Sequence, residues 1–190
     1  TESVDKLVTT AASHNRVFIL EVMGRDAGWI ALNAAIAGGA DVCIIPEIPY
    51  DIDKVKEKIE SRYKKGRGFC IIVVAEGSKN ANGEQVGMES QIPGDRHFKL
   101  GGIGEALKFE LQQAGIEHDI RVSVLGHLQR GGTPIAYDRV LASEFGVKAF
   151  ELAMKGEFGK MVAYKHPDII AVTFEEALRA LRAKGRKTSH

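Results

Sequence analysis

The sequence predicts an α/β fold in which helices cover both faces of a mostly parallel sheet, as in a Rossmann-like three-layer sandwich. First, apolar runs of strand length alternate with amphipathic helical patterns, which is typical of parallel strands joined by crossover helices. Second, residues 17–22 (VFILEV) and 68–75 (GFCIIVVA) are almost entirely apolar, as expected of strands buried on both faces. Third, 190 residues with a hydrophobic fraction of 44% are enough for a substantial core.

The expected elements follow one another between turn residues. Helical periodicity begins at the first residues, and Gly38 with Gly39 stops a helix that starts at Trp29. Apolar side chains four residues apart mark the inner faces of two later helices. Trp29 is expected to pack beneath its helix. We expect strands over residues 17–22, 41–46, 68–75 and 119–125, and helices over residues 29–37, 53–65 and 103–114.

The segment over residues 77–100 interrupts this alternation, because it is rich in Gly, Asn and other polar residues. A loop of that length inside a compact domain is unusual and is either functional or mobile. After it, Leu141, Phe145, Ala149 and Leu152 describe one face of a helix that follows Pro134. We further expect a strand over residues 161–164 and a last helix that a Thr173–Glu176 capping box opens.

Composition excludes several classes of function. The chain has 26 basic and 25 acidic residues, a formal net charge of +1, whereas nucleic-acid-binding proteins show a basic excess or stripe. The sequence contains no signal peptide, membrane-spanning stretch or lipidation motif, which predicts a cytoplasmic protein with no membrane partner. Cys43 and Cys70 lie inside apolar runs and are expected to be buried free thiols. No ligand spacing indicates a metal site in this chain.

Polar side chains follow three of the expected strands. Because the carboxyl ends of parallel strands meet at one edge of a sheet, these side chains are expected to share that edge. Arginines there would suit phosphate, and a carboxylate would accept hydrogen bonds from sugar hydroxyls. The alternative is three unrelated surface ion pairs, which are common and contribute little stability. The residues are Met23, Gly24 and Arg25 after the first strand, Glu76 after the third, and His127 and Arg130 after the fourth.

The stretch LGHLQRGGTP over residues 125–134 indicates a strand that turns into a helix. Gly131 and Gly132 allow a tight turn, and Thr133 with Pro134 is suited to the N-cap and first position of a helix. A helix N-terminus favours an anion nearby, so a phosphate site is expected here. The alternative is a structural turn whose arginine pairs with an acid.

Four motifs together resemble the C-terminal half of 6-phosphofructokinase, in order and over nearly the whole chain. The resemblance implies a Rossmann-like half of a two-domain enzyme that transfers a phosphoryl group from ATP or pyrophosphate to the 1-hydroxyl of fructose 6-phosphate. The product would be fructose 1,6-bisphosphate, in glycolysis. The motifs are EVMGRDAGWIAL (21–32), IIPEIP (44–49), VVAEGS (73–78) and LGHLQRGGTPIAYDRVLASEFG (125–146).

The resemblance also implies roles for individual residues. Met23, Gly24 and Arg25 would lie against the sugar and the transferred phosphoryl group, with Arg25 stabilising the charge of the transition state. Glu76 would bind sugar hydroxyls. His127 and Arg130 would hold fructose 6-phosphate. Arg16 and Arg121 would reach across a subunit interface into the neighbour's 6-phosphate site, which implies a homodimer or homotetramer.

The family's phosphate loop and catalytic aspartate base are missing from this sequence, which we expect to begin after them. The Mg²⁺ cofactor would therefore be bound mainly by the missing half, and the 190 residues alone are expected to be inactive. Residues 1–183 would form the sugar-phosphate-binding half, and residues 77–100 an insertion like that of extended family members. Residues 184–190 would form a disordered basic tail. The alternative function is a non-catalytic, sugar-phosphate-sensing regulatory half of a duplicated phosphofructokinase.

Overall fold

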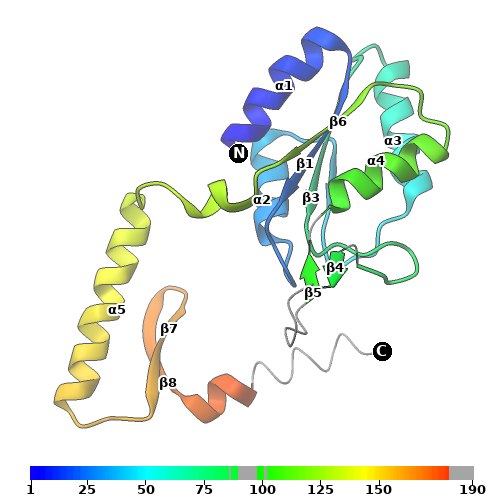
Figure 1. Ribbon diagram of the computed structural model, residues 1–190. Coiled ribbons are helices and arrows are strands. Elements are labelled where there is room, and N and C mark those ends of the chain that lie inside the picture. Colours follow the sequence, from blue (N-terminus) through cyan, green and yellow to red (C-terminus); the bar gives the residue numbers. More distant parts are fainter. Residues whose placement is uncertain (86, 90–97, 101, 180–190) are drawn as a thin grey trace. The chain divides into compact units, whose positions relative to one another are not determined.

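The computed structural model describes residues 1–85, 87–89, 98–100 and 102–179 of the chain. It divides the chain into two compact units, Thr1–Gly131 and Gly132–His190 (Figure 1). Sequence reasoning placed no boundary at this point, and the assignment of residues 1–183 to one functional half stays a prediction. The tail expected at residues 184–190 lies outside the described residues.

A four-stranded parallel sheet in the order β2-β3-β1-β6 forms the centre of the first unit. Its two central strands, β1 (Val17–Val22) and β3 (Cys70–Ala75), are buried at every residue and pair along their whole length. The outer strands β2 (Val42–Ile44) and β6 (Ile120–Val124) are shorter than predicted. The parallel sheet inferred from continuous apolar runs is therefore confirmed.

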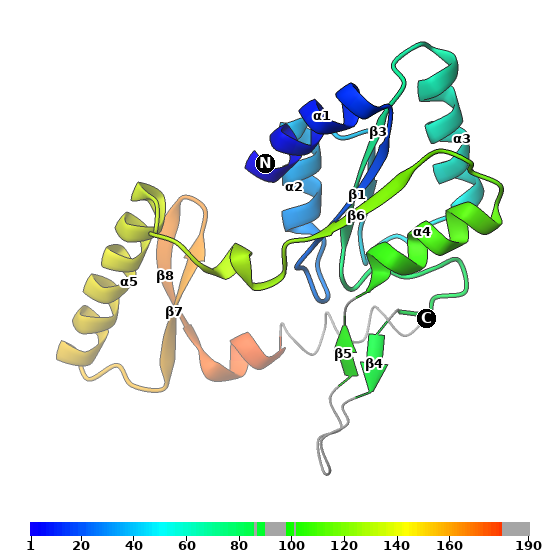
Figure 2. The same cartoon turned by 45° about the horizontal axis from the view of Figure 1, so that its top comes forward.

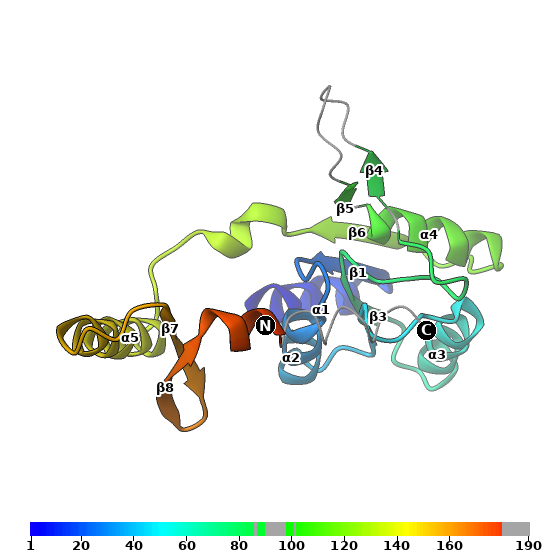
Figure 3. The ribbon, with the colours of Figure 1, turned by 90° about the horizontal axis from the view of Figure 1, so that it is seen from below.

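Helices cover both faces of this sheet, which confirms the three-layer architecture (Figures 2 and 3). On one face, α1 (Glu2–His14) and α2 (Trp29–Gly38) enclose a core cluster with alternate residues of β1 and β3. On the other face, α3 (Ile52–Lys64) and α4 (Ile103–Gln113) enclose a second cluster with the intervening residues. The strand period of two residues thus divides each buried strand between the two cores.

The expected inner faces of α3 and α4 are confirmed. Val55 and Ile59 are buried, and Tyr63 packs against the same cluster. Ile103 and Leu107 are likewise fully buried on α4. The N-cap of α3 is Asp51, whose Oδ1 accepts hydrogen bonds from the backbone N–H groups of residues 53 and 54 at 3.0 and 3.4 Å. This side chain satisfies two of the donors that a helix N-terminus leaves open.

Trp29 does not pack beneath its helix, so that prediction is wrong: the side chain is 69% exposed. The buried residues of α2 are Ala31 and Ala35. Since each residue turns a helix by about 100°, Trp29 points about 200° away from Ala31 and faces outward. By contrast, Cys70 is a buried free thiol in β3, which confirms the expectation for it. Cys43 in β2 is a free thiol as expected, but it is only half-buried.

The segment expected as a loop over residues 77–100 contains two short strands. β4 (Gly87–Glu89) pairs antiparallel with β5 (Phe98–Leu100), and Lys79 forms an isolated antiparallel bridge with Gln85. The prediction of a loop is therefore wrong for residues 87–89 and 98–100, because their backbone N–H and C=O groups are paired between two strands. Residues 86 and 90–97 lie outside the described part of the chain.

The second unit contains the helix α5 (Ala136–Met154) and an antiparallel hairpin of β7 (Lys160–Lys165) and β8 (Asp168–Thr173). The strand expected at residues 161–164 is confirmed as part of β7, whereas β8 was missed. The Thr173 capping box is confirmed: Glu176 Oε2 accepts the Thr173 N–H at 2.8 Å, and Thr173 Oγ1 accepts the Glu176 N–H at 3.1 Å.

The start of α5 differs from the prediction, which placed the N-cap at Thr133 and the first helical position at Pro134. The N-cap is Ile135, and the helix begins at Ala136. Asp138 Oδ2 accepts the Ile135 N–H at 3.2 Å, so an acid inside the first turn stabilises the helix start in place of the threonine. The helix start predicted at Thr133 and Pro134 is therefore wrong, whereas the phosphate site expected near this turn stays a prediction.

We expect the stability of the protein to fall in alkaline solution. Burial raises the pKa of the Cys70 thiol to about 12 and that of the Tyr63 hydroxyl to about 12. The native state therefore keeps these protons at a pH where the unfolded chain loses them. Their contribution to the free energy of unfolding is fully present below the pKa values of the unfolded chain and is lost as the pH rises toward 12. The loss is about 1.4 kcal/mol per pH unit for each group that titrates only when unfolded.

Urea unfolding between pH 8 and 11, followed by circular dichroism, measures this slope. Cys70→Ala removes one of the two groups and should make the slope shallower. An unchanged slope in that variant would show that Cys70 does not contribute to the alkaline loss.

Candidate functional site

Three neighbouring strands of the first unit end at the same edge of the sheet, here called the carboxyl edge. Val22 at the end of β1 lies beside Ala75 at the end of β3, and Glu21 lies beside Val124 of β6. Beyond these pairs, the Glu76 N–H donates to the Val22 carbonyl at 2.9 Å. The segments that follow β1, β3 and β6 therefore leave the sheet side by side.

The turn after β1 lies directly against the segment after β3. Gly24 has a φ of 149°, and a Cβ there would lie 2.8 Å from the Ala27 carbonyl oxygen. A Cβ on Gly77 would overlap the Arg25 carbonyl oxygen. Glycine at both positions thus allows the Met23–Gly24–Arg25 backbone to lie next to Glu76.

A glutamine connects the third segment to this turn. The residues after β6 form a short 3₁₀ helix, η1 (Gly126–Arg130), in place of the simple turn that was expected. From this helix, Gln129 Oε1 accepts the Met23 N–H at 2.8 Å. Sequence reasoning missed Gln129. The only signal for it is its position between His127 and Arg130 in the glycine-rich motif.

The predicted edge residues carry uncompensated charge. Arg25, His127 and Arg130 are exposed, and Glu76 is half-buried. Within the described part of the chain, none of these four side chains has a hydrogen-bond or ion-pair partner. Among the predicted edge residues, two guanidinium groups outnumber the single carboxylate, and this excess suits an anion. Since no described residue bonds to it, the Glu76 carboxylate remains available to accept hydrogen bonds from hydroxyl groups.

The other two predicted site residues lie at the opposite, amino edge of the sheet. Arg16 immediately precedes β1, and Arg121 is the second residue of β6. A six-residue strand spans about 20 Å, so these arginines cannot join the carboxyl-edge residues of the same chain. They do meet each other, because both form ion pairs with Asp119.

A buried glutamate near the carboxyl end of β1 binds the N-terminus of α4. Glu21 is only 3% exposed within β1. Its Oε1 accepts the Gly102 N–H at 3.1 Å, and its Oε2 accepts the Gly104 N–H at 2.8 Å. The carboxylate therefore caps the N-terminus of α4, where the helix dipole favours negative charge. Sequence reasoning missed this role, although an acid inside an apolar strand is the signal that could have found it.

The residues of this edge do not fit a Mg²⁺ site. Among the described residues, no group of three or more His, Cys, Asp or Glu could hold a metal ion. Glu47, which follows β2, accepts the Gly28 N–H through both carboxylate oxygens at 3.0 and 3.1 Å and so caps α2. Glu76 alone supplies too few of the oxygen ligands that Mg²⁺ requires.

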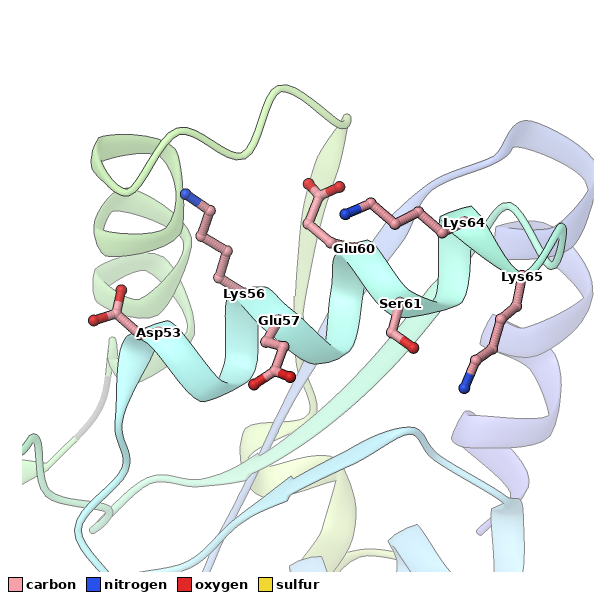
Figure 4. A pocket seen from close by; sticks show the side chains of 7 residues that line it. All are labelled: Asp53, Lys56, Glu57, Glu60, Ser61, Lys64 and Lys65. Carbon is pink, nitrogen blue, oxygen red and sulfur yellow. The ribbon is translucent and has the colours of Figure 1, made fainter.

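A surface pocket of about 580 Å³ lies along α3 (Figure 4). Its charged lining consists of three acids and three lysines, so it has no net preference for an anion. We therefore do not assign it to phosphate. The lining residues of this pocket are Asp53, Lys56, Glu57, Glu60, Ser61, Lys64 and Lys65.

None of the helices described for this chain is long and apolar enough to cross a membrane.

The first unit is thus an α/β protein of the parallel three-layer class. The Phosphofructokinase family model matches residues 1–153. The chain belongs to the phosphofructokinase family.

Relatives in bacteria carry a more specific name. The chain is 52% identical over 165 residues to the ATP-dependent 6-phosphofructokinase 2 of Clostridium perfringens, covering 87% of this chain and 45% of that protein. It is 47% identical over 182 residues to the ATP-dependent 6-phosphofructokinase of Mycobacterium tuberculosis, covering 96% and 53%. The chain thus spans about half the length of the curated relatives it matches.

Solved structures agree with this family. Phosphofructokinase from Saccharomyces cerevisiae matches with a TM-score of 0.79 and 34% identity, over 99% of this chain and 24% of that chain. A pyrophosphate-dependent phosphofructokinase from Marinobacter aquaeolei matches with a TM-score of 0.70 and 25% identity, over 90% and 43%. The predicted family and fold class are therefore confirmed.

Proposed function

We propose that this chain is the fructose 6-phosphate-binding half of an ATP-dependent 6-phosphofructokinase. The whole protein would transfer the γ-phosphoryl group of ATP to the 1-hydroxyl of fructose 6-phosphate, giving ADP and fructose 1,6-bisphosphate in glycolysis. One observation carries the proposal: in a chain of this family, Arg25, Glu76, His127 and Arg130 follow adjacent strands at one edge and have no partner among the described residues.

Each edge residue would have a distinct task. The sugar lies against the Met23–Gly24 backbone, where glycine allows close approach, and Glu76 accepts hydrogen bonds from its hydroxyls. His127 and Arg130 hold the sugar phosphate. Arg25 donates to the phosphoryl group in transfer, whose charge spreads over the equatorial oxygens. Fixed cations at that point stabilise the transition state more than the ground state.

Arg16 and Arg121 would serve the site of a neighbouring subunit. They lie at the amino edge, about the length of β1 away from the residues that bind the sugar in the same chain. An identical subunit could present its own pair to the 6-phosphate across a symmetric interface. This arrangement requires at least a homodimer, and a homotetramer would satisfy it as well.

ATP is the proposed phosphoryl donor, with pyrophosphate as the alternative. Relatives at 45–52% identity are named ATP-dependent, whereas a structural neighbour named pyrophosphate-dependent is 25% identical. A donor site would belong to the additional length that these relatives have. For the same reason we expect the 190 residues alone to show no turnover.

The test is an assay of the intact protein with fructose 6-phosphate, Mg²⁺ and either ATP or pyrophosphate. Turnover with ATP alone is the expected result, and turnover with pyrophosphate alone would reassign the donor. A folded protein that binds fructose 6-phosphate without turning it over with either donor would instead be a regulatory sensor.

Replacing Arg130 by alanine should weaken use of the sugar. Removing one partner of a charge-assisted contact costs about 2–5 kcal/mol, so we expect the KM for fructose 6-phosphate to rise roughly 30-fold or more, with the KM for ATP unchanged. The matched control is Arg179→Ala, because Arg179 forms an exposed ion pair with Glu175 four residues away. An unchanged sugar KM in Arg130→Ala would contradict the assignment.

A further inference from the structure

We propose that Asp119 is a positioning residue that holds Arg16 and Arg121 together as one phosphate-binding element at the amino edge. This inference rests on the proposed function and extends it, since it assigns a role to an acid in a site expected to bind an anion. An acid beside two phosphate-binding arginines could either compete with the phosphate or hold the arginines in place. The geometry of the three side chains favours the second role.

Both arginines bind the same carboxylate, and both do so through Nε. Arg16 Nε donates to Asp119 Oδ2 at 2.6 Å. Arg121 Nε lies 3.1 Å from Asp119 Oδ1, and its Nε and Nη2 each donate to Oδ2 at 3.2 Å. A guanidinium has five N–H donors in a fixed fork. The carboxylate engages the Nε side of each fork and leaves most terminal N–H groups for a second anion.

The backbone fixes Asp119 where it can reach both arginines. The Val17 N–H donates to the Asp119 carbonyl at 3.0 Å, and Phe18 pairs with Arg121 in the β1–β6 ladder. The sheet therefore brings together two arginines that are distant in sequence. Two like charges on adjacent strands repel each other, and Asp119 lowers the charge of the group from +2 to +1 while keeping the forks close.

The carboxylate stays ionised at neutral pH. Desolvation acts to raise the pKa of Asp119, but the hydrogen bonds from Arg16 and Arg121 outweigh it and hold the pKa below its ordinary value. All three side chains remain partly accessible, with 29% of Arg16, 56% of Arg121 and 44% of Asp119 exposed. An incoming phosphate can therefore reach the arginines without displacing the acid.

The two possible roles of Asp119 predict changes of opposite sign. If Asp119 only competes with phosphate, Asp119→Asn removes a negative charge and tightens sugar phosphate binding. If Asp119 positions the arginines, the same change leaves two long side chains free to move. Binding then weakens, because each binding event must also order these side chains, at a cost in conformational entropy.

The experiment uses the intact protein and steady-state kinetics with fructose 6-phosphate and ATP. Asp119→Asn should raise the sugar KM about tenfold or more, with kcat within about twofold and the KM for ATP unchanged. Asp119→Glu keeps the charge and should recover most of the loss. In Asp119→Asn/Arg16→Ala, the two losses should be less than additive, as expected for groups in one network. A sugar KM that is unchanged or lower in Asp119→Asn would overturn the proposal.

Two controls separate positioning from a general structural effect. Asp53→Asn makes the same substitution at an exposed residue of α3 and should leave the sugar KM unchanged. Gel filtration of Asp119→Asn should match the wild type in the absence of ligand, and the thermal midpoint should fall only slightly, as expected for exposed ion pairs. A large fall in the midpoint or a changed assembly, not restored in Asp119→Glu, would assign Asp119 a merely structural role and overturn the proposal.

A binding measurement keeps this test independent of catalysis. If the intact wild-type protein turns over no sugar, calorimetric titration with fructose 6-phosphate and with inorganic phosphate still measures the arginine pair. Weaker binding in Asp119→Asn than in the wild type would then support the positioning role even though the proposed function had failed. No binding of either probe by the wild type would overturn both.

Discussion

Gly77→Ala is expected to displace the turn that carries Arg25. A methyl group at this position would overlap the Arg25 carbonyl oxygen and lie 2.7 Å from its carbonyl carbon. Both atoms belong to the backbone, so a side-chain rotation cannot relieve the overlap. We expect the free energy of unfolding to fall by about 3 kcal/mol. If Arg25 has the catalytic role proposed above, kcat/KM for fructose 6-phosphate should fall roughly 100-fold, since displacing a catalytic group by about 1 Å has that effect.

Urea unfolding of the chain and kinetics of the intact protein measure these two effects. Gly146→Ala is the control for stability, because Gly146 lies inside α5 and a Cβ there would meet nothing within 4 Å. That change should be neutral or slightly stabilising. If Gly77→Ala behaved in the same way, the close approach of Gly77 to Arg25 would be refuted.

Glu21→Ala is the second change with a large expected effect. The buried carboxylate accepts the N–H groups of Gly102 and Gly104, which open α4. Hydrogen bonds to a charged group contribute about 1.5–3 kcal/mol each, and the substitution would leave two donors without this partner. We expect the free energy of unfolding to fall by about 3 kcal/mol. Glu21→Gln, which keeps one acceptor oxygen, should lose less.

The control for this prediction is Glu105→Ala on the same helix. Glu105 is an exposed acid in the first turn of α4, with Lys108 at 3.8 Å. Its removal should cost well under about 1 kcal/mol. Equal losses in the Glu21 and Glu105 variants would mean that the capping carboxylate contributes no more than a surface charge.

The residues of the carboxyl edge could be predicted because they depend only on where each strand ends in the sequence. Parallel strands are recognisable as continuous apolar runs, and the residue that follows each run must lie at the same edge. This reasoning placed Arg25, Glu76 and His127 at one edge with no knowledge of side-chain contacts. Arg16 and Arg121 were not among these residues, because they precede or lie within their strands. That the two arginines meet at Asp119 required the tertiary structure. Their expected roles in substrate binding remain predictions.

The helix α5 shows where local signals compete. Thr133 and Pro134 form a good helix start. The N-cap is nevertheless Ile135, whose N–H donates to the Asp138 carboxylate, and the helix begins two residues after Pro134. The capping preference for Thr over Ile amounts to only about 0.5–2 kcal/mol, so other contacts such as the Asp138 hydrogen bond can outweigh it. The strand β8 was missed because its signal depends on pairing with β7.

Four features are recognisable from the amino-acid pattern alone: the fold class, the two buried strands, the inner faces of α3 and α4, and the motifs that indicate the family. These properties follow from periodicity and from residues close together in the chain. The hydrogen-bond partners of Met23, Glu21 and Arg16 are known only from the folded chain, because they lie 106, 83 and 103 residues away in the sequence. Such contacts leave no periodic trace, because they depend on which strands the sheet places side by side and on where each strand ends.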